Sequence, residues 1–395
     1  MRVLVATYPL APVGPDTCGG TEQVAWLLLQ GLAADPELEI TWLGAAGSSS
    51  IPNLRFRPWV ARTSKLITPP ELSLLVRDCS DEIVRCARAE QFDLVHSLGA
   101  LFYRDAARIQ APVLFSLHLA RELYPSDFTG VKPFNLHFHC VSRAQWAGYG
   151  AAACCGVIPN GIAVDQFNPR RRQAQPSSPL LFLGRICREK GPDLAIALAR
   201  RLRRRLILVG EPGPFPAHRQ YFEDQIAPNL GECVSWLPPP SLSRKLRLLR
   251  QAAAVLICSR VEETSSMVAM EAAASGVPVL ALRRGTLPEI VVPGVTGWLG
   301  EDIEELANMA AHLGVIEPAA CRSHAEKNFQ VAQMVDGYRN LYRNLAQSGL
   351  KIEMHGGTLD SGGLGPPTQS PEYWRGRPRH GQLRPERPGL GVALR

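Results

Sequence analysis

The sequence predicts an α/β protein made of two doubly wound units, each a parallel sheet with helices on both faces. Three observations lead to this prediction. The length of 395 residues exceeds what a single hydrophobic core usually organises. Short apolar runs alternate with helical segments along most of the chain. A polar stretch with the composition of a linker, residues 169–179, separates two such series.

The first series begins at the amino terminus, where residues 3–6 form a short apolar run that predicts a buried strand. A loop rich in proline and glycine follows, and residues 21–32 have the apolar spacing of a helix. The buried-strand pattern recurs, with helical segments such as residues 71–88 between the runs, at residues 40–43, 94–96 and 113–117. We therefore expect an N-terminal Rossmann-like domain over residues 1–172, with a parallel sheet.

The second series predicts a C-terminal domain over residues 178–325. Its strands are expected at residues 180–183, 206–209, 255–258 and 279–282. Between two such units we expect a cleft, because doubly wound sheets bind ligands at such an edge. Apolar residues at helical spacing predict a closing helix over residues 326–347. The remaining residues, 348–395, are rich in glycine, proline and arginine, so we expect a disordered tail and assign it no role.

Composition excludes several classes of protein. The chain shows no long apolar run, and the apolar segment at residues 1–6 is too short for the apolar region of a signal peptide. The ten cysteines include no Cys-x-x-Cys and no Cys and His cluster at metal-ligand spacing. We therefore expect a cytoplasmic protein with free thiols and no metal site. The net charge of +7 is partly local, since five arginines lie within residues 200–205. Such a cluster is typical of the solvated carboxyl-terminal end of a helix. A weak peripheral contact with a membrane is the alternative. No aromatic residues alternate with the arginines, which argues against a nucleic-acid-binding surface.

The most informative segment runs from residue 258 to residue 276. It predicts a strand, a loop and a helix that Ser265 or Ser266 caps and Gly276 ends. The start of this helix, Ser266, Met267 and Val268, presents free backbone N–H groups, which form an anion site. Two carboxylates flank it: one in the preceding loop and one a turn inside the helix.

Those carboxylates are Glu263 and Glu271. Carboxylates beside a phosphate would repel it, so the pair makes sense if both accept hydrogen bonds from sugar hydroxyls on either side of the phosphate. The alternative is that Glu263 is a solvated loop acid and Glu271 an exposed helix residue.

A second loop, residues 184–191, also follows a strand and opens a helix, so it should reach the same sheet edge. Its Arg185 and Lys190 supply the positive charge that a diphosphate needs. The chain has no Asp-x-Asp motif for a divalent cation, so these side chains and a helix dipole would replace the metal. The alternative is a solvated loop with a surface ion pair to Glu189.

These motifs together resemble glycosyltransferase family four. They are residues 184–191, the Glu263 and Glu271 pair with its alanine-rich continuation to residue 279, and residues 287–291. The similarity extends to about residue 347 and includes residues 16–22 and 157–162. The resemblance implies the GT-B fold, in which two Rossmann-like domains face a cleft and a C-terminal helix closes the structure.

The resemblance also implies a function. The family transfers a sugar, here of hexose type, from a nucleoside diphosphate to an acceptor hydroxyl with retention of configuration, without a metal or other cofactor. Gly19 and Gly20 would form the glycine loop that lets the backbone approach the donor, and His118 would face the donor sugar; a simple tight turn and a structural histidine are the alternatives.

Glu263 would hold sugar hydroxyls and Glu271 the ribose diol, while the acceptor would be a sugar, a lipid-linked sugar or a small molecule. Two other functions stay open on the same architecture. One is a nucleotide-sugar epimerase, and the other is a catalytically silent protein that binds nucleotide sugars.

Overall fold

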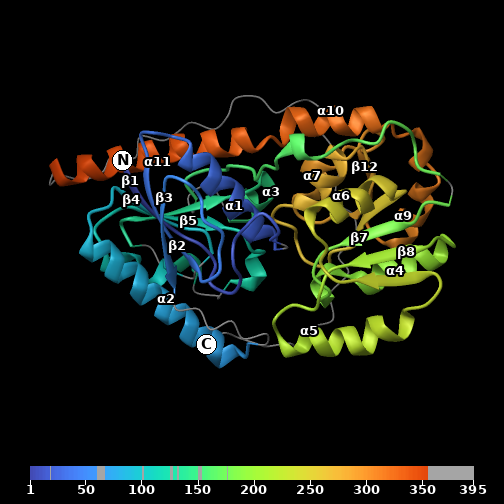
Figure 1. The fold of residues 1–395 in the computed structure, drawn as a ribbon, viewed down its shortest axis with the longest axis horizontal. Helices are drawn as coiled ribbons and strands as arrows, with labels where there is room; N and C mark the ends of the chain where they lie inside the picture. Colours follow the sequence, from blue (N-terminus) through green and yellow to red (C-terminus); the bar gives the residue numbers. More distant parts are fainter. Residues whose placement is uncertain are drawn as a thin grey trace.

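The computed structural model describes residues 1–17, 19–59, 67–99, 102–124, 128–130, 133–149, 154–175 and 177–354. Its core is two six-stranded sheets, and every recorded strand pair is parallel. The N-terminal sheet and the C-terminal sheet lie side by side, in blue to teal and in green to orange (Figure 1). This is the expected α/β architecture of two doubly wound units.

Both sheets have the same strand order, in which the first strand of the unit lies next to the fourth. The N-terminal strands, in the spatial order β3-β2-β1-β4-β5-β6, are β3 Leu54–Trp59, β2 Glu39–Ala45, β1 Arg2–Ala6, β4 Leu94–Ser97, β5 Val113–Leu117 and β6 Leu136–Cys140. The C-terminal strands, in the order β12-β11-β10-β7-β8-β9, are β12 Gly297–Gly300, β11 Val279–Leu282, β10 Ala254–Ile257, β7 Leu180–Leu183, β8 Leu206–Val209 and β9 Val234–Leu237. Such a sheet binds ligands where its order reverses, between β1 and β4 or between β7 and β10.

Helices cover both faces of each sheet. They are α1 Gly20–Ala33, α2 Pro69–Ala89, α3 Arg143–Tyr149, α4 Pro192–Arg201, α5 Pro216–Tyr221, α6 Leu242–Gln251, α7 Met267–Ala274, α8 Leu287–Ile290, α9 Ile303–Ala310, α10 Pro318–Asn328 and α11 Val331–Met354. Strand β1 shows why two layers form: Val3 and Val5 pack in the cluster with α1 and α11, while Leu4 and Ala6 pack in the cluster with α2. Alternate residues of a strand point to opposite faces, so an uninterrupted apolar run buries both.

The carboxyl-terminal helical segment differs from the single closing helix predicted over residues 326–347. Two helices are present, and the chain breaks between Asn328 and Val331. The break has a local cause, because Ile162 forms a parallel bridge with Gln330 and exchanges backbone hydrogen bonds with Phe329 and Val331 of 2.8 and 3.0 Å. These peptide groups therefore cannot take part in a continuous helix.

Helix α11 returns to the N-terminal sheet, where it packs beside α1 and contacts β4 (Figure 1). A buried polar network fixes it there: His96 Nδ1 lies 2.5 Å from Tyr342 Oη, and His96 Nε2 lies 2.7 Å from Ser116 Oγ. Ser116 Oγ also lies 3.2 Å from Tyr338 Oη. The helix continues through Met354, beyond the predicted start of the tail at residue 348, and residues 355–395 of that tail lie outside the described residues.

The arginine cluster lies at the end of α4, as its composition predicted, and three of its members have defined contacts. Arg201 forms an ion pair with Glu304, Arg204 donates to Ser178 O at 2.7 Å and Arg205 donates to Ser177 O at 3.0 Å. None of the helices in the described part of the chain combines the length and apolar composition that crossing a bilayer needs.

Candidate active site

Three predicted site residues of the C-terminal unit lie on the segments that follow the two central strands of its sheet. Arg185 and Lys190 follow β7, and Glu263 follows β10. Because β7 and β10 are neighbours at the point where the strand order reverses, both loops emerge at the same edge. The structure therefore brings together two segments that are more than 70 residues apart in the sequence, as the contact between Lys190 and Glu263 shows.

Both glutamates are buried, and each is paired with a lysine. Glu263 is 7% exposed and Glu271 is 4% exposed. Lys190 Nζ lies 2.7 Å from Glu263 Oε1, and Lys245 Nζ lies 2.6 Å from Glu271 Oε1. The alternatives of a solvated loop acid and an exposed helix residue are therefore wrong. The alternative ion pair between Lys190 and Glu189 is not the one formed.

Helix α7 begins as predicted, with Ser266 as its N-cap. The Ser266 hydroxyl accepts a hydrogen bond from Ala269 N at 3.4 Å, and Gly276 beyond the helix end has φ of +70°. The backbone N–H groups of Met267 and Val268 precede the first intrahelical bond, so they remain available to an anion. Ser265 Oγ is buried and has no hydrogen-bond partner.

The N-terminal sheet brings its own predicted residues to this edge. Gly19 is the N-cap of α1 and Gly20 its first residue, and a Cβ built on Gly20 would lie 3.9 Å from Met267 Cγ. The start of α1 therefore faces the start of α7. At the end of β5, His118 O accepts a hydrogen bond from Thr264 Oγ1 at 2.9 Å, so the loop bearing Glu263 also contacts the N-terminal unit.

His118 Nε2 is buried and has no hydrogen-bond partner. Burial lowers the pKa of His118 to about 4, so the imidazole is neutral at neutral pH. Native structures pair most buried polar atoms with protein or water. The unpartnered Ser265 hydroxyl and His118 nitrogen, on two loops in contact, therefore mark this place as one where a ligand can supply hydrogen bonds.

Three residues near this edge were not singled out from the sequence. Lys245, on α6, pairs with Glu271, and Ser259 donates a short hydrogen bond to Glu263. Burial raises the pKa of Glu22, near the start of α1, while the charge of Arg185 opposes that shift. Arg185 itself is exposed. A helix start followed by an acid was visible in residues 20–22, but no sequence signal connects Lys245 with Glu271.

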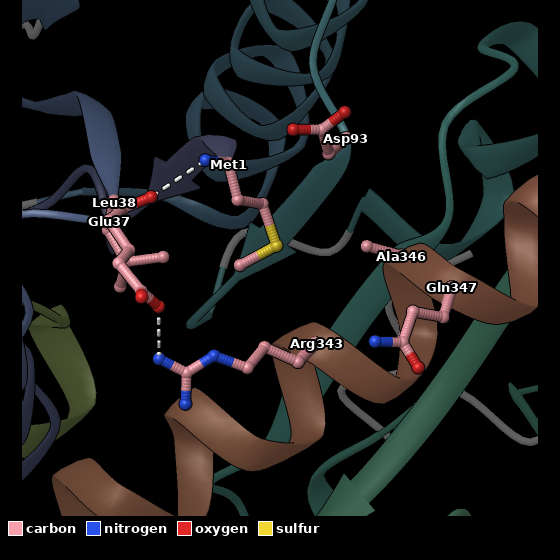
Figure 2. A pocket seen from close by; sticks show the side chains of 7 residues that line it. All are labelled: Met1, Glu37, Leu38, Asp93, Arg343, Ala346 and Gln347. Carbon is pink, nitrogen blue, oxygen red and sulfur yellow. Dashed lines mark hydrogen bonds and ion pairs between the residues drawn. The ribbon is translucent and has the colours of Figure 1, made fainter.

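A cavity of about 310 Å³ lies elsewhere, between α11 and the starts of β1 and β2. Its lining residues are Met1, Glu37, Leu38, Asp93, Arg343, Ala346 and Gln347 (Figure 2). Figure 2 shows that the salt bridge between Arg343 and Glu37 spans one side of it, with atoms 2.9 Å apart. This cavity is at the amino ends of the strands, the opposite edge from the candidate site, so it does not belong to that site.

Solved structures of known proteins share this architecture. Sucrose-phosphate synthase from Thermosynechococcus elongatus superposes with a TM-score of 0.72 at 18% identity, over 88% of this chain and 100% of that one. A glycosyltransferase involved in avilamycin A biosynthesis superposes with a TM-score of 0.61 at 24% identity, over 87% of this chain and 98% of that one. The chain has the GT-B fold.

Sequence comparisons match part of this GT-B protein. Residues 178–314 match the family model described as Glycosyl transferases group 1. A D-inositol 3-phosphate glycosyltransferase from Nocardia farcinica is 34% identical over 177 residues, which are 40% of this chain and 39% of the relative. The enzyme of the same name from Mycolicibacterium smegmatis is 33% identical over 196 residues, 46% of this chain and 45% of the relative. The matches span less than half of either relative, and they support a glycosyltransferase.

Proposed function

We propose that this protein is a retaining glycosyltransferase of family four that transfers a sugar of hexose type from a nucleoside diphosphate to an acceptor hydroxyl. One observation carries the proposal. At the strand-order reversal of the C-terminal sheet, the start of α7 adjoins a loop with two cations, and two buried carboxylates flank that helix start. An anion site that lies between two carboxylates can bind a donor in which a diphosphate joins a sugar to a ribose, because the carboxylates accept hydrogen bonds from hydroxyls on either side of the phosphates.

Each residue has a role in this proposal. Arg185, Lys190 and the backbone amides from Ser266 to Val268 stabilise the diphosphate, first in the bound donor and then as negative charge develops on the leaving group. Lys190 donates to Glu263 through one hydrogen, and its side chain is 30% exposed, so its other hydrogens can reach a phosphate oxygen. No metal on the diphosphate is needed, because these groups supply the positive charge.

Glu263 and Glu271 accept hydrogen bonds from the donor's hydroxyls. Glu263 binds the transferred sugar and Glu271 binds the ribose diol, and each of these buried carboxylates is paired with a lysine. Gly20 leaves room for the donor beside α7, whereas Gly19 contributes its backbone, because the Glu22 carboxylate fills the place of a side chain there. Neutral His118 faces the sugar from the N-terminal unit. The acceptor hydroxyl attacks from the face that the diphosphate leaves, with no protein nucleophile.

The two units bind different substrates. Residues 178–325 bind the donor and residues 1–172 bind the acceptor, and the carboxyl-terminal helical segment connects the two units. Matches to D-inositol 3-phosphate glycosyltransferases support a small polyol or sugar acceptor, and solved structures of the Anabaena protein HepE in complex with UDP-glucose or with UDP and glucose make UDP-glucose the first donor to test. Free thiols at the nine described cysteines support a reducing, cytoplasmic compartment.

The test combines donor binding with product stereochemistry. Calorimetric titration with UDP- and GDP-sugars identifies the donor, and NMR of the product formed with inositol phosphates and simple sugars gives the anomeric configuration, with and without a chelator. Retained configuration and chelator-resistant transfer are expected. An inverted product would contradict the family, donor epimerised without an acceptor would indicate the epimerase, and tight binding without transfer would indicate the silent binding protein.

A further inference from the structure

A group of three side chains with different ligand chemistry lies beside the donor loop. Cys187 and Glu189 are on the loop between β7 and α4, and His218 is on α5. Their donor atoms all lie within 4.8 Å of one another. Within the described ranges of the chain, no other set of three or more His, Cys, Asp or Glu residues is close enough to hold a metal ion.

These side chains are incompletely satisfied by the protein. Glu189 Oε2 and His218 Nδ1 are both buried without a hydrogen-bond partner. His218 Nε2 faces Glu189 Oε1 at 4.0 Å, which is too long for a hydrogen bond. The His218 side chain is 12% exposed. A cation held between His218 Nε2 and the Glu189 carboxylate would give both groups a partner, because their separation leaves no direct hydrogen bond between them.

The local sequence leaves space for this arrangement. A Cβ built on Gly213 would lie 2.3 Å from His218 Nδ1, so only glycine there lets the imidazole keep its position. His218 N donates to Phe215 O at 3.0 Å, which fixes the first turn of α5. The Cys187 thiol contacts Arg185 O at 3.8 Å, a weak interaction that a metal can replace.

We propose that Cys187, Glu189 and His218 bind a Zn²⁺ ion. A thiolate, an imidazole and a carboxylate are the ligands that Zn²⁺ takes, whereas Mg²⁺ and Ca²⁺ take oxygen ligands alone. One thiolate and one carboxylate balance the two positive charges of the ion, although Arg185 nearby weakens the attraction. Three protein ligands leave the fourth tetrahedral position to water. On binding, the Cys187 thiol releases its proton to solvent while its sulfur bonds to zinc.

This site would hold the donor loop in one conformation. Cys187 and Glu189 lie between Arg185 and Lys190, and zinc would tie them to α5, more than 25 residues further along the chain. The consequence for the donor rests on the proposed function, whereas zinc binding itself does not. The spacing of Cys and His along the sequence predicts no metal site, because these three side chains come together from two segments that are far apart in the chain.

The test uses the full chain without nucleotide. Equilibrium dialysis against Zn²⁺ followed by elemental analysis should give about one ion per chain, and Co²⁺ in its place should show the absorption of a thiolate-to-cobalt charge transfer. Cys187→Ser and His218→Gln should each weaken zinc binding by on the order of tenfold or more. Cys233→Ser is the matched control, since Cys233 is an exposed free thiol. Circular dichroism of each metal-free variant shows whether the fold is retained.

Zinc retained equally by Cys187→Ser, or no zinc bound by the folded wild type, would overturn the site. A second measurement addresses the loop: UDP affinity of the wild type should change at least about threefold when zinc is added, and that of Cys187→Ser should not. Equal effects of zinc on both proteins would overturn the connection to the loop. Because zinc binding is measured without nucleotide, failure of the donor proposal leaves the metal result interpretable.

Discussion

Lys190 Nζ lies 2.7 Å from Glu263 Oε1, so the cation assigned to the diphosphate is held by the carboxylate assigned to the sugar. Ser259 donates to the same carboxylate oxygen. This pairing joins the loop after β7 to the loop after β10 before any donor arrives. It also means that substitution of either residue alters the charge of the other's surroundings.

Lys190→Ala should weaken UDP binding by on the order of tenfold or more, because it removes a charge-assisted hydrogen bond to phosphate. Transfer should slow as well, since the proposed role of the ammonium includes stabilising the departing diphosphate. Calorimetry with UDP and initial rates at low donor concentration measure the two effects. Lys327→Ala, at an exposed lysine of α10, is the control. Unchanged UDP affinity in Lys190→Ala would place the diphosphate elsewhere.

Glu271→Gln and Lys245→Met should each lower the stability of the unliganded protein, because each leaves a largely buried partner without its counter-charge. The double variant should lose less free energy of unfolding than the two single variants lose together, by at least about 1 kcal/mol. Chemical denaturation of the four proteins gives this cycle. Donor affinity is a separate readout: Glu271→Gln should lose on the order of tenfold, and an unchanged value would exclude the ribose role.

Gly20→Ala should separate folding from donor binding. A Cβ at Gly20 would lie 3.9 Å from Met267 Cγ, which is ordinary van der Waals contact, so the unliganded melting temperature should hardly change. The added methyl group would occupy space beside the start of α7, and UDP-sugar affinity should fall by on the order of tenfold. Gly148→Ala is the control, because a Cβ there meets nothing within 4 Å. Equal donor affinity in both variants would remove Gly20 from the site.

Acid should destabilise the protein through its buried histidines. Burial lowers the pKa of His139 to about 3 and that of His118 to about 4, against an ordinary value of 6.5. Between these values and 6.5, each histidine binds a proton in the unfolded chain and not in the folded chain. The free energy of unfolding therefore falls as pH drops below 6.5, by up to about 1.4 kcal/mol per pH unit for each histidine, down to about pH 4 for His118 and about pH 3 for His139.

Denaturant unfolding at pH 7.5, 6 and 5 measures this loss. The stability of His139→Gln should depend less steeply on pH, because glutamine does not take up a proton in either state. Glutamine is chosen because its amide oxygen can still accept the hydrogen bond that Ile158 N donates to His139 Nε2 at 3.0 Å. His312→Gln, at an exposed position, should keep the wild-type dependence. Identical pH dependence in all three proteins would mean that His139 takes up a proton in the folded state.

Much of the fold follows from local sequence. The central strands were predicted because they are buried on both faces: β1 and β10 are uninterrupted apolar runs, and their neighbours have the same character. The four strands that the sequence analysis did not single out, β3, β6, β9 and β12, are the four sheet edges. Strand β3 contains Arg55 and Arg57, so its apolar signal is broken although its backbone still pairs with β2.

The fold class, the central strands and the start of α7 could be predicted from the sequence alone, because strand burial and helix capping depend on residues near in the chain. Which charged side chains meet depends on tertiary packing. It pairs Lys190 with Glu263 rather than Glu189, gives Glu271 the partner Lys245, and places His218 beside Cys187. Each of these contacts joins different loops or helices, and their distances depend on how the strands order and the helices pack, which no local pattern records.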